Sequence, residues 1–156
     1  MVIDSHVHIG KLAVFGSSIT FEEAIKLADD MEIDKIFCTH IISLYYDFEE
    51  GDALFLDAMK KYRERILGYV TVTSPRHGKK LLNHLERYIC GYGFHGIKIY
   101  SHSKGMGGYQ AWLSIKDSYM YPIFEKACEW KVPILAHATP EECDFVCTNF
   151  PDLKLI

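Results

Sequence analysis

The sequence lacks the features that mark membrane proteins and nucleic-acid-binding proteins. Its longest apolar stretches are a handful of residues, far short of the roughly 18 that a membrane-spanning helix needs. It has no basic excess, because 17 Lys and Arg residues stand against 21 Asp and Glu residues, a formal net charge of −4. Asp4 and His6 occupy the place where a signal peptide has its apolar core. We therefore expect a cytoplasmic protein with neither nucleic acid nor a membrane as a partner.

The sequence also lacks a CxxC pair, and its cysteines are scattered: Cys38, Cys90, Cys128, Cys143 and Cys147. This pattern predicts reduced, mostly buried thiols rather than a disulfide framework. Cys143 and Cys147 lie four residues apart on an expected helix and would supply half of a metal site. Because no further ligands lie nearby in the sequence, we interpret them as structural.

The chain is long enough for one hydrophobic core. It has 156 residues, of which 49% are hydrophobic and 24% charged, and its mean hydropathy is −0.02. These values are typical of a globular protein. We expect a single domain over residues 1–156.

Strands and helices alternate along the sequence. Two helices begin with capping boxes, one at Thr20 with Glu23 and one at Thr139 with Glu142. Proline at position 140 favours the second helix start. The expected strands are 2–8, 34–39, 66–72, 96–100, 132–137 and the beginning of a sixth at 153–156, and the other expected helices are 51–63, 81–89 and 121–130.

Strands separated by helices predict a parallel sheet, which is either open or closed into an eight-stranded barrel. A (β/α)8 barrel takes roughly 250 residues, so this chain holds about five βα units and the start of strand six. Length alone favours an open, flavodoxin-like sheet. A nucleotide-binding sheet would have a glycine-rich turn after its first strand, but residues 8–12 read His-Ile-Gly-Lys-Leu.

Histidines follow the first strand instead. His6 and His8 are two residues apart, so both point to one face of the strand together with Asp4, while Ile3, Val7 and Ile9 point to the other. Two imidazoles at the carboxyl end of a parallel strand can bind one metal ion. The alternative is a hydrogen-bonded histidine pair.

Other strand ends carry further polar residues. His137 closes the fifth strand, and Lys98 lies between Ile97 and Ile99 and is expected to face inward. A buried lysine needs a partner or loses its charge. As a functional residue, Lys98 could form a metal-bridging carbamate, contact a substrate anion or place a charge next to the metal ligands. As a structural residue, it would extend its ammonium group to water.

The long connection after the fourth strand is expected to contact substrate. It covers residues 101–117, and we assign substrate binding to Tyr100, His102 and Tyr109. His40 follows the second strand, and no spacing singles it out. We interpret His77, His84 and His95 as structural residues.

These motifs together resemble the amidohydrolase superfamily of metal-dependent hydrolases. Within it they are similar to the amidohydrolase-related branch that also contains the aminocarboxymuconate-semialdehyde decarboxylases. The matching segments cover the whole chain in order: residues 3–8, 96–100, 121–127 leading into 132–137, and 150–156.

The resemblance implies a (β/α)8 barrel in which His6 and His8 bind a divalent metal, usually zinc, with His137 as a further ligand. In members with two metals, the lysine at the position of Lys98 is carbamylated and bridges them. The family also has a histidine after strand six and an aspartate after strand eight, beyond residue 156. We therefore expect the chain to be the N-terminal part of a longer protein. The alternative is a half barrel that pairs with a second copy to form a homo-oligomer.

The function implied by the resemblance is hydrolysis of an amide, ester or lactone bond in a small-molecule substrate by metal-activated water. One alternative is metal-dependent, non-oxidative decarboxylation by the same residues. Another is a non-catalytic metal-binding half barrel, if 156 residues are the whole protein.

Overall fold

The computed structural model describes residues 1–12, 16–72, 78–100 and 114–156. These residues form two compact units, Met1–Tyr69 and Val70–Ile156. The expectation of a single domain over the whole chain stays a prediction. Predictions that concern residues 13–15, 73–77 and 101–113 lie outside the described residues.

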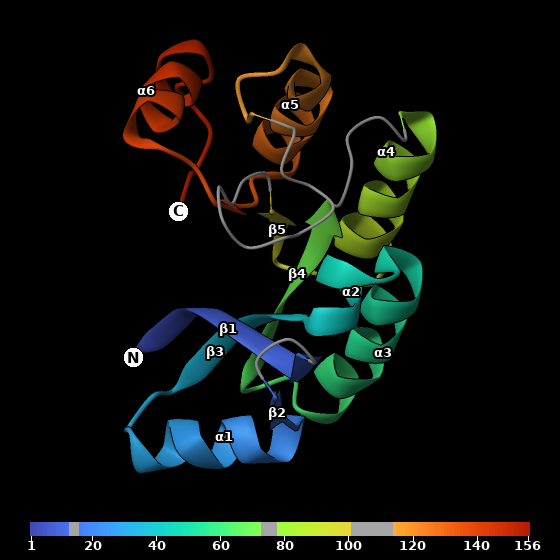
Figure 1. The fold of residues 1–156 in the computed structure, drawn as a ribbon, viewed down its shortest axis with the longest axis vertical. Helices are drawn as coiled ribbons and strands as arrows, with labels where there is room; N and C mark the ends of the chain where they lie inside the picture. The colour runs from blue at the N-terminus through green and yellow to red at the C-terminus, as the bar shows by residue number, and fades with distance from the viewer. Residues whose placement is uncertain (13–15, 73–77, 101–113) are drawn as a thin grey trace. The chain divides into compact units, whose positions relative to one another are not determined.

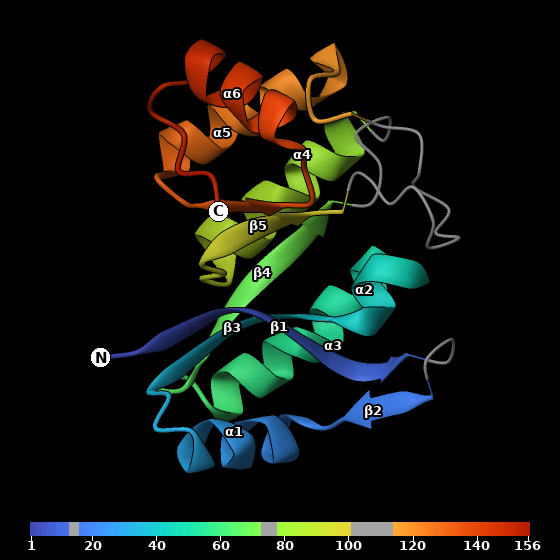
Figure 2. The ribbon, with the colours of Figure 1, turned by 60° about the vertical axis from the view of Figure 1, so that its left-hand side comes forward.

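The first unit is built on a mostly parallel sheet with the strand order β2-β1-β3-β4. Its strands are β1 (Ile3–Leu12), β2 (Ser17–Ile19), β3 (Lys35–His40) and the beginning of β4 (Ile66–Val72). β1 and β3 pair in parallel and run side by side in Figures 1 and 2. β2 is antiparallel to the end of β1. The sequence pattern did not predict this hairpin, and β1 continues to Leu12 instead of ending near residue 8.

The pairing of β1 with β3 shifts register in the middle of β1. Asp4 pairs with Ile36 and Val7 with Cys38, so three steps along β1 match two steps along β3. Such a shift adds one residue to one strand and locally changes which face each side chain takes. Ile9 is buried as expected, but Ile3 is 40% exposed. The simple alternation that predicted one buried face for Ile3, Val7 and Ile9 is therefore wrong at Ile3.

Three helices complete the first unit: α1 (Phe21–Asp30), α2 (Ile41–Tyr45) and α3 (Phe48–Lys61). The capping box of Thr20 and Glu23 is present at the start of α1, as predicted. The short helix α2 was not predicted. It packs closely on α3, because an added Cβ on Gly51 would collide with the backbone nitrogen of Ser43. Only glycine fits at this crossing.

The second unit contains the end of β4 and continues the strand order as β4-β5-β6. Lys98 of β5 pairs in parallel with Leu135 of β6, and Leu155 forms a parallel bridge to Ile134. That bridge is the beginning of the expected sixth strand. Helices α5 and α6 lie side by side in Figures 1 and 2. The unit consists of α4 (Lys79–Glu86), the π-helical turn η3 (Arg87–Gly91), β5 (Gly96–Ile99), the 3-10 turn η4 (Ser118–Met120), α5 (Tyr121–Trp130), β6 (Ile134–Ala136) and α6 (Pro140–Asn149).

The fold class is confirmed. The chain is an α/β protein of the (β/α)8 barrel type: among the described residues β1, β3 and β4 pair in parallel, β5 pairs in parallel with β6, and Leu155 begins a further strand beside β6. β6 is shorter than the expected 132–137. Pro133 has no N–H to donate to a neighbouring strand, so regular pairing begins after it.

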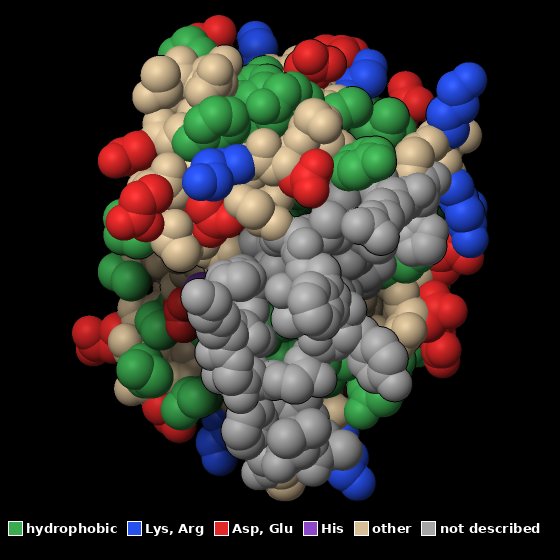
Figure 3. All heavy atoms as spheres, turned by 45° about the horizontal axis from the view of Figure 1, so that its top comes forward, with side chains coloured by type: hydrophobic (Ala, Val, Ile, Leu, Met, Phe, Trp, Pro, Cys, Tyr) green, Lys and Arg blue, Asp and Glu red, His purple; other side chains and the backbone are tan. Residues whose placement is uncertain are grey.

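On the face drawn in Figure 3, acidic and basic side chains are interspersed. Within the described ranges, none of the helices is both long and apolar enough to cross a membrane.

Candidate metal and substrate site

The two histidines of β1 converge on one point. Their Nε2 atoms are 3.1 Å apart, and their ring planes meet at 77°. His6 is exposed and His8 is partly buried, so the pair is open to solvent on one side. At this distance, one imidazole N–H can donate to the other ring nitrogen.

This donor pair fits a divalent metal. Two imidazole nitrogens bound to one tetrahedral zinc ion at 2.0–2.1 Å are roughly 3.3 Å apart. The observed separation of 3.1 Å is close to that value without rearrangement of β1. Within each unit, the described residues contain no group of three His, Cys, Asp or Glu side chains that could hold a metal. A metal ion bound to this pair would therefore need further ligands.

Two contacts hold β1 in shape beside His6. The backbone N–H of His6 donates to Oδ1 of Asp4 at 3.0 Å. The hydroxyl of Tyr69 donates to the carbonyl oxygen of Ser5 at 3.0 Å. Tyr69 itself is buried and stacks on Phe37, with ring centroids 3.7 Å apart. Sequence reasoning missed Tyr69, because nothing in the pattern of β4 distinguishes it from any other core aromatic residue.

Lys98 is fully buried in β5, as predicted. Its exposed fraction is 0%, and its neighbours Ile97 and Ile99 are also buried. Burial lowers the pKa of its ammonium group from 10.5 to about 8, because the charged form is poorly solvated there. Lys98 therefore gives up its proton more readily than an exposed lysine does. A buried amine of this kind can pair with an anion or react as a nucleophile.

His137 lies directly after β6 and next to β5. Its backbone N–H donates to the carbonyl of Ile99 at 3.2 Å, and its ring lies 4.8 Å from the ring of Tyr100. Tyr100 is buried and His137 is partly buried. The register of β5 and β6 thus brings His137 and Tyr100 together at the carboxyl ends of their strands, which is where α/β active sites are built.

The predicted residues therefore form two groups. The first unit brings His6 and His8 together, and the second unit brings Tyr100 and His137 together beside the strand that carries Lys98. His102 and Tyr109 lie outside the described residues. The assignments to metal ligation and substrate binding stay predictions.

His40 has a structural role in the first unit. Its Nδ1 accepts a hydrogen bond from the N–H of Ile42 at 3.2 Å and caps α2. Burial lowers the pKa of His40, and the charge of Glu50 opposes that effect. The ring packs over Gly10, whose φ of 111° favours glycine and where a Cβ would lie 3.2 Å from the imidazole. His40 therefore caps α2 and packs against the end of β1.

Glu142 has a second role that the capping pattern alone did not predict. One carboxylate oxygen accepts from the N–H of Thr139 at 2.9 Å, which closes the capping box of α6. The other accepts from the hydroxyl of Ser114. The buried carboxylate thus links the residue that follows 101–113 to the turn after His137.

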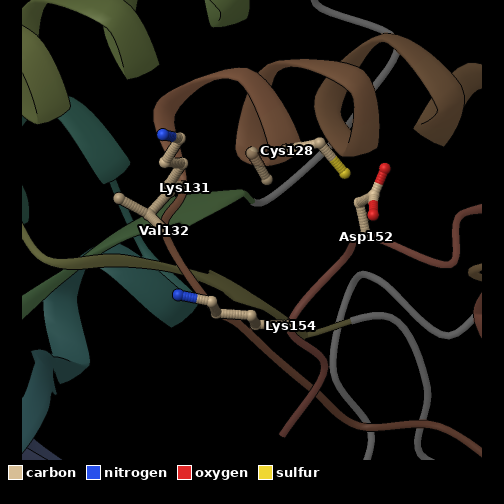
Figure 4. A pocket seen from close by; sticks show the side chains of 6 residues that line it. Cys128, Lys131, Val132, Asp152 and Lys154 are labelled. Atoms are coloured by element: carbon tan, nitrogen blue, oxygen red, sulfur yellow. The ribbon is translucent and has the colours of Figure 1, made fainter.

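A separate cavity lies at the opposite end of β6. It has a volume of about 340 Å³ and is lined by Ala127, Cys128, Lys131, Val132, Asp152 and Lys154. Figure 4 shows the sulfur of Cys128 directed toward Asp152. Val132 precedes β6 whereas His137 follows it, so this cavity is distinct from the candidate site. The C-terminal end of α5 and Asp152 offset the charges of its two lysines, which leaves little preference for an anion.

The sequence of residues 45–156 matches the model of a protein family described as Amidohydrolase. No curated protein matches the sequence of the chain.

Several solved structures share its fold. The 4-oxalomesaconate hydratase LigJ from Rhodopseudomonas palustris is 19% identical with a TM-score of 0.70, and the match covers 99% of this chain and 62% of that one. The 5-carboxyvanillate decarboxylase LigW from Sphingomonas paucimobilis is 13% identical with a TM-score of 0.71 and coverages of 99% and 66%. A dihydroxybenzoic acid decarboxylase from a Polaromonas species, with bound manganese and the inhibitor 2-nitroresorcinol, is 12% identical with a TM-score of 0.70 and coverages of 99% and 63%. The chain thus spans less than two thirds of the length of these structures.

Proposed function

This chain belongs to the amidohydrolase family, and from that premise we propose that it carries the metal-binding part of an enzyme acting on a small molecule. The reaction that we propose first is hydrolysis of an amide, ester or lactone bond. The observation that carries the proposal is the 3.1 Å separation of the Nε2 atoms of His6 and His8.

In this proposal, His6, His8 and His137 are the protein ligands of one divalent metal. Neutral imidazole nitrogens suit zinc and several other divalent ions. Zinc is our first choice, although the Polaromonas decarboxylase holds manganese. A bound ion would supply an acidified water and polarise the carbonyl of the substrate.

The residues of the chain prepare this site in three ways. Asp4 and Tyr69 hold the peptide group between Ser5 and His6, Asp4 through the N–H of His6 and Tyr69 through the carbonyl of Ser5, so that the ring of His6 stays beside His8. Tyr100 packs against His137 and restricts its ring. Lys98, with its pKa lowered to about 8, would offer a cation to a substrate anion or an amine for carbamylation.

Non-oxidative decarboxylation is the second candidate. It is favoured by the buried amine of Lys98, which could pair with a substrate carboxylate, and by the activities for which two of the similar structures are named. Hydrolysis releases a carboxylic acid, whereas decarboxylation removes a carboxylate as carbon dioxide. The proposed metal ligands are the same for both reactions. Binding without catalysis is the remaining alternative.

The first experiment is metal analysis of the purified chain after incubation with zinc or manganese and removal of the excess. We expect about one ion per chain, and loss of that ion in the His6→Ala/His8→Ala variant. The matched control is His95→Ala, which removes an exposed histidine outside the site. Equal metal content in all three proteins would reject the proposed ligands.

The second experiment distinguishes the reactions. Small esters, lactones and amides are assayed for acid release, and hydroxylated aromatic acids for carbon dioxide release, with the metal-loaded chain and with any longer form of the protein. Acid release that is lost in the histidine variant supports hydrolysis. Carbon dioxide release alone would replace hydrolysis by decarboxylation, and metal binding without either product would support a binding module.

A further inference from the structure

Helix α6 carries two cysteines one turn apart. Cys143 and Cys147 are at positions i and i+4, where side chains on a helix face one another with Cβ atoms about 5–6 Å apart. Neither forms a disulfide; Cys143 is partly buried and Cys147 is exposed. The pKa of Cys143 is raised, first by burial and then by the charge of Cys147. The two thiols are therefore close enough to interact.

This pair does not suit zinc. A structural zinc site takes four ligands, usually including cysteine or histidine. Nowhere in the part of the chain that the structure describes do three His, Cys, Asp or Glu side chains gather as a metal site would require. Two sulfur ligands alone can complete the coordination of an ion that binds only two ligands.

We propose that Cys143 and Cys147 form a two-thiolate binding site for a soft monovalent metal ion of the Cu(I) and Ag(I) class. Thiolates select soft ions of this class, and two of them complete a linear coordination. On binding, each thiol loses its proton and two metal–sulfur bonds form. One ion therefore displaces two protons, and no electron is transferred.

Acidic side chains lie beside the pair. Glu142 and Asp144 flank Cys143, and their negative charges raise its pKa further. They oppose two free thiolates, and a cation bound between the two sulfurs offsets part of that repulsion. Because Cys147 lies at the surface, an ion can reach the pair from solvent. The site involves none of the histidines of the proposed catalytic site and is independent of the proposed function.

The test is a titration of the whole chain with Ag(I), which is a stable substitute for Cu(I). The other accessible thiols are first removed in a Cys90→Ser/Cys128→Ser background, and Cys38 stays in place because it is fully buried. We expect one tightly bound ion per chain and release of two protons. The Cys147→Ser variant should bind about 10²-fold more weakly, since one thiolate loses the advantage of a linked second ligand.

A matched control keeps the number of thiols and changes only their spacing. In the Cys147→Ser/Thr148→Cys variant, the second thiol moves about 100° around the helix and no longer faces Cys143. We expect this variant to bind Ag(I) as weakly as Cys147→Ser does. Thermal melts check that each variant stays folded. Unchanged affinity in either variant, or release of a single proton by the parent, would overturn the proposal.

Discussion

The hydroxyl of Tyr69 donates a hydrogen bond to the carbonyl of Ser5 across 3.0 Å, although the two residues are 64 positions apart in the sequence. Ser5 and His6 lie where the pairing of β1 with β3 shifts register, between the Asp4–Ile36 and Val7–Cys38 pairs. Tyr69 supplies a hydrogen bond at that interruption. A residue of β4 thus helps to hold the segment that carries the histidine pair.

The Tyr69→Phe variant keeps the ring stacked on Phe37 and removes this single hydrogen bond. We expect the free energy of unfolding to fall by about 1 kcal/mol, or somewhat more because the Ser5 carbonyl loses its donor. Urea denaturation measures this change. The control is Tyr119→Phe, because Tyr119 is 56% exposed and its hydroxyl can bond to water. Equal loss in the two variants would argue against a specific role for the Tyr69 hydroxyl.

Replacement of Lys98 by methionine is expected to stabilise the protein at pH 7. The pKa of Lys98 is lowered from 10.5 to about 8 in the folded state, so protonation of Lys98 destabilises the folded state. This loss in the free energy of unfolding is fully present below about pH 8 and declines as the pH rises toward 10.5. The shift corresponds to about 3 kcal/mol as an upper value.

Paired urea titrations at several pH values test this expectation for Lys98. The stability advantage of Lys98→Met should shrink between pH 8 and 10.5. If Lys98→Met destabilises the protein at every pH, the expectation is wrong, because the lysine side chain then stabilises the folded state in spite of its burial.

His40 should make the first unit sensitive to acid. Its Nδ1 caps α2 only as an acceptor, and its pKa is lowered in the folded state, chiefly by burial. The contribution of the cap is therefore present above the ordinary pKa of histidine and is lost as the pH falls through and below it. His40→Asn keeps a capping oxygen that does not titrate near neutral pH. We expect the variant to lose less stability than the parent between pH 7 and 5, as followed by circular dichroism.

The acid dependence of His40→Asn is compared directly with that of the parent. A parent-like acid dependence in His40→Asn would mean that other groups cause the loss of stability.

Gly51→Ala is expected to destabilise the packing of α2 on α3. A Cβ at position 51 would meet both the backbone nitrogen and the hydroxyl of Ser43, and backbone atoms cannot move aside easily. Overpacking of this kind typically costs about 1–3 kcal/mol, and we expect the upper end of that range. Differential scanning calorimetry provides the measurement. Gly91→Ala serves as control, because nothing lies within 4 Å of a Cβ there.

Much of the local structure could be predicted from the sequence. The capping boxes of Thr20 with Glu23 and of Thr139 with Glu142 are both present, because they depend on residues only three positions apart. The burial of Lys98 between two isoleucines followed from the alternation of a strand. The histidine pair followed from the same alternation, since residues two apart share a face.

The tertiary structure decided what depends on distant partners. The register shift in β1, the β2 hairpin and the helix α2 leave no clear periodic signal, because each is held by contacts with another strand or helix. No spacing in the sequence singled out His40, and its capping role became visible only through its neighbours in the structure. The periodicity of the sequence shows which face of a strand or helix a side chain occupies. Only tertiary packing determines which other residues that face contacts, and the hydrogen bond from Tyr69 to Ser5 is a contact of that kind.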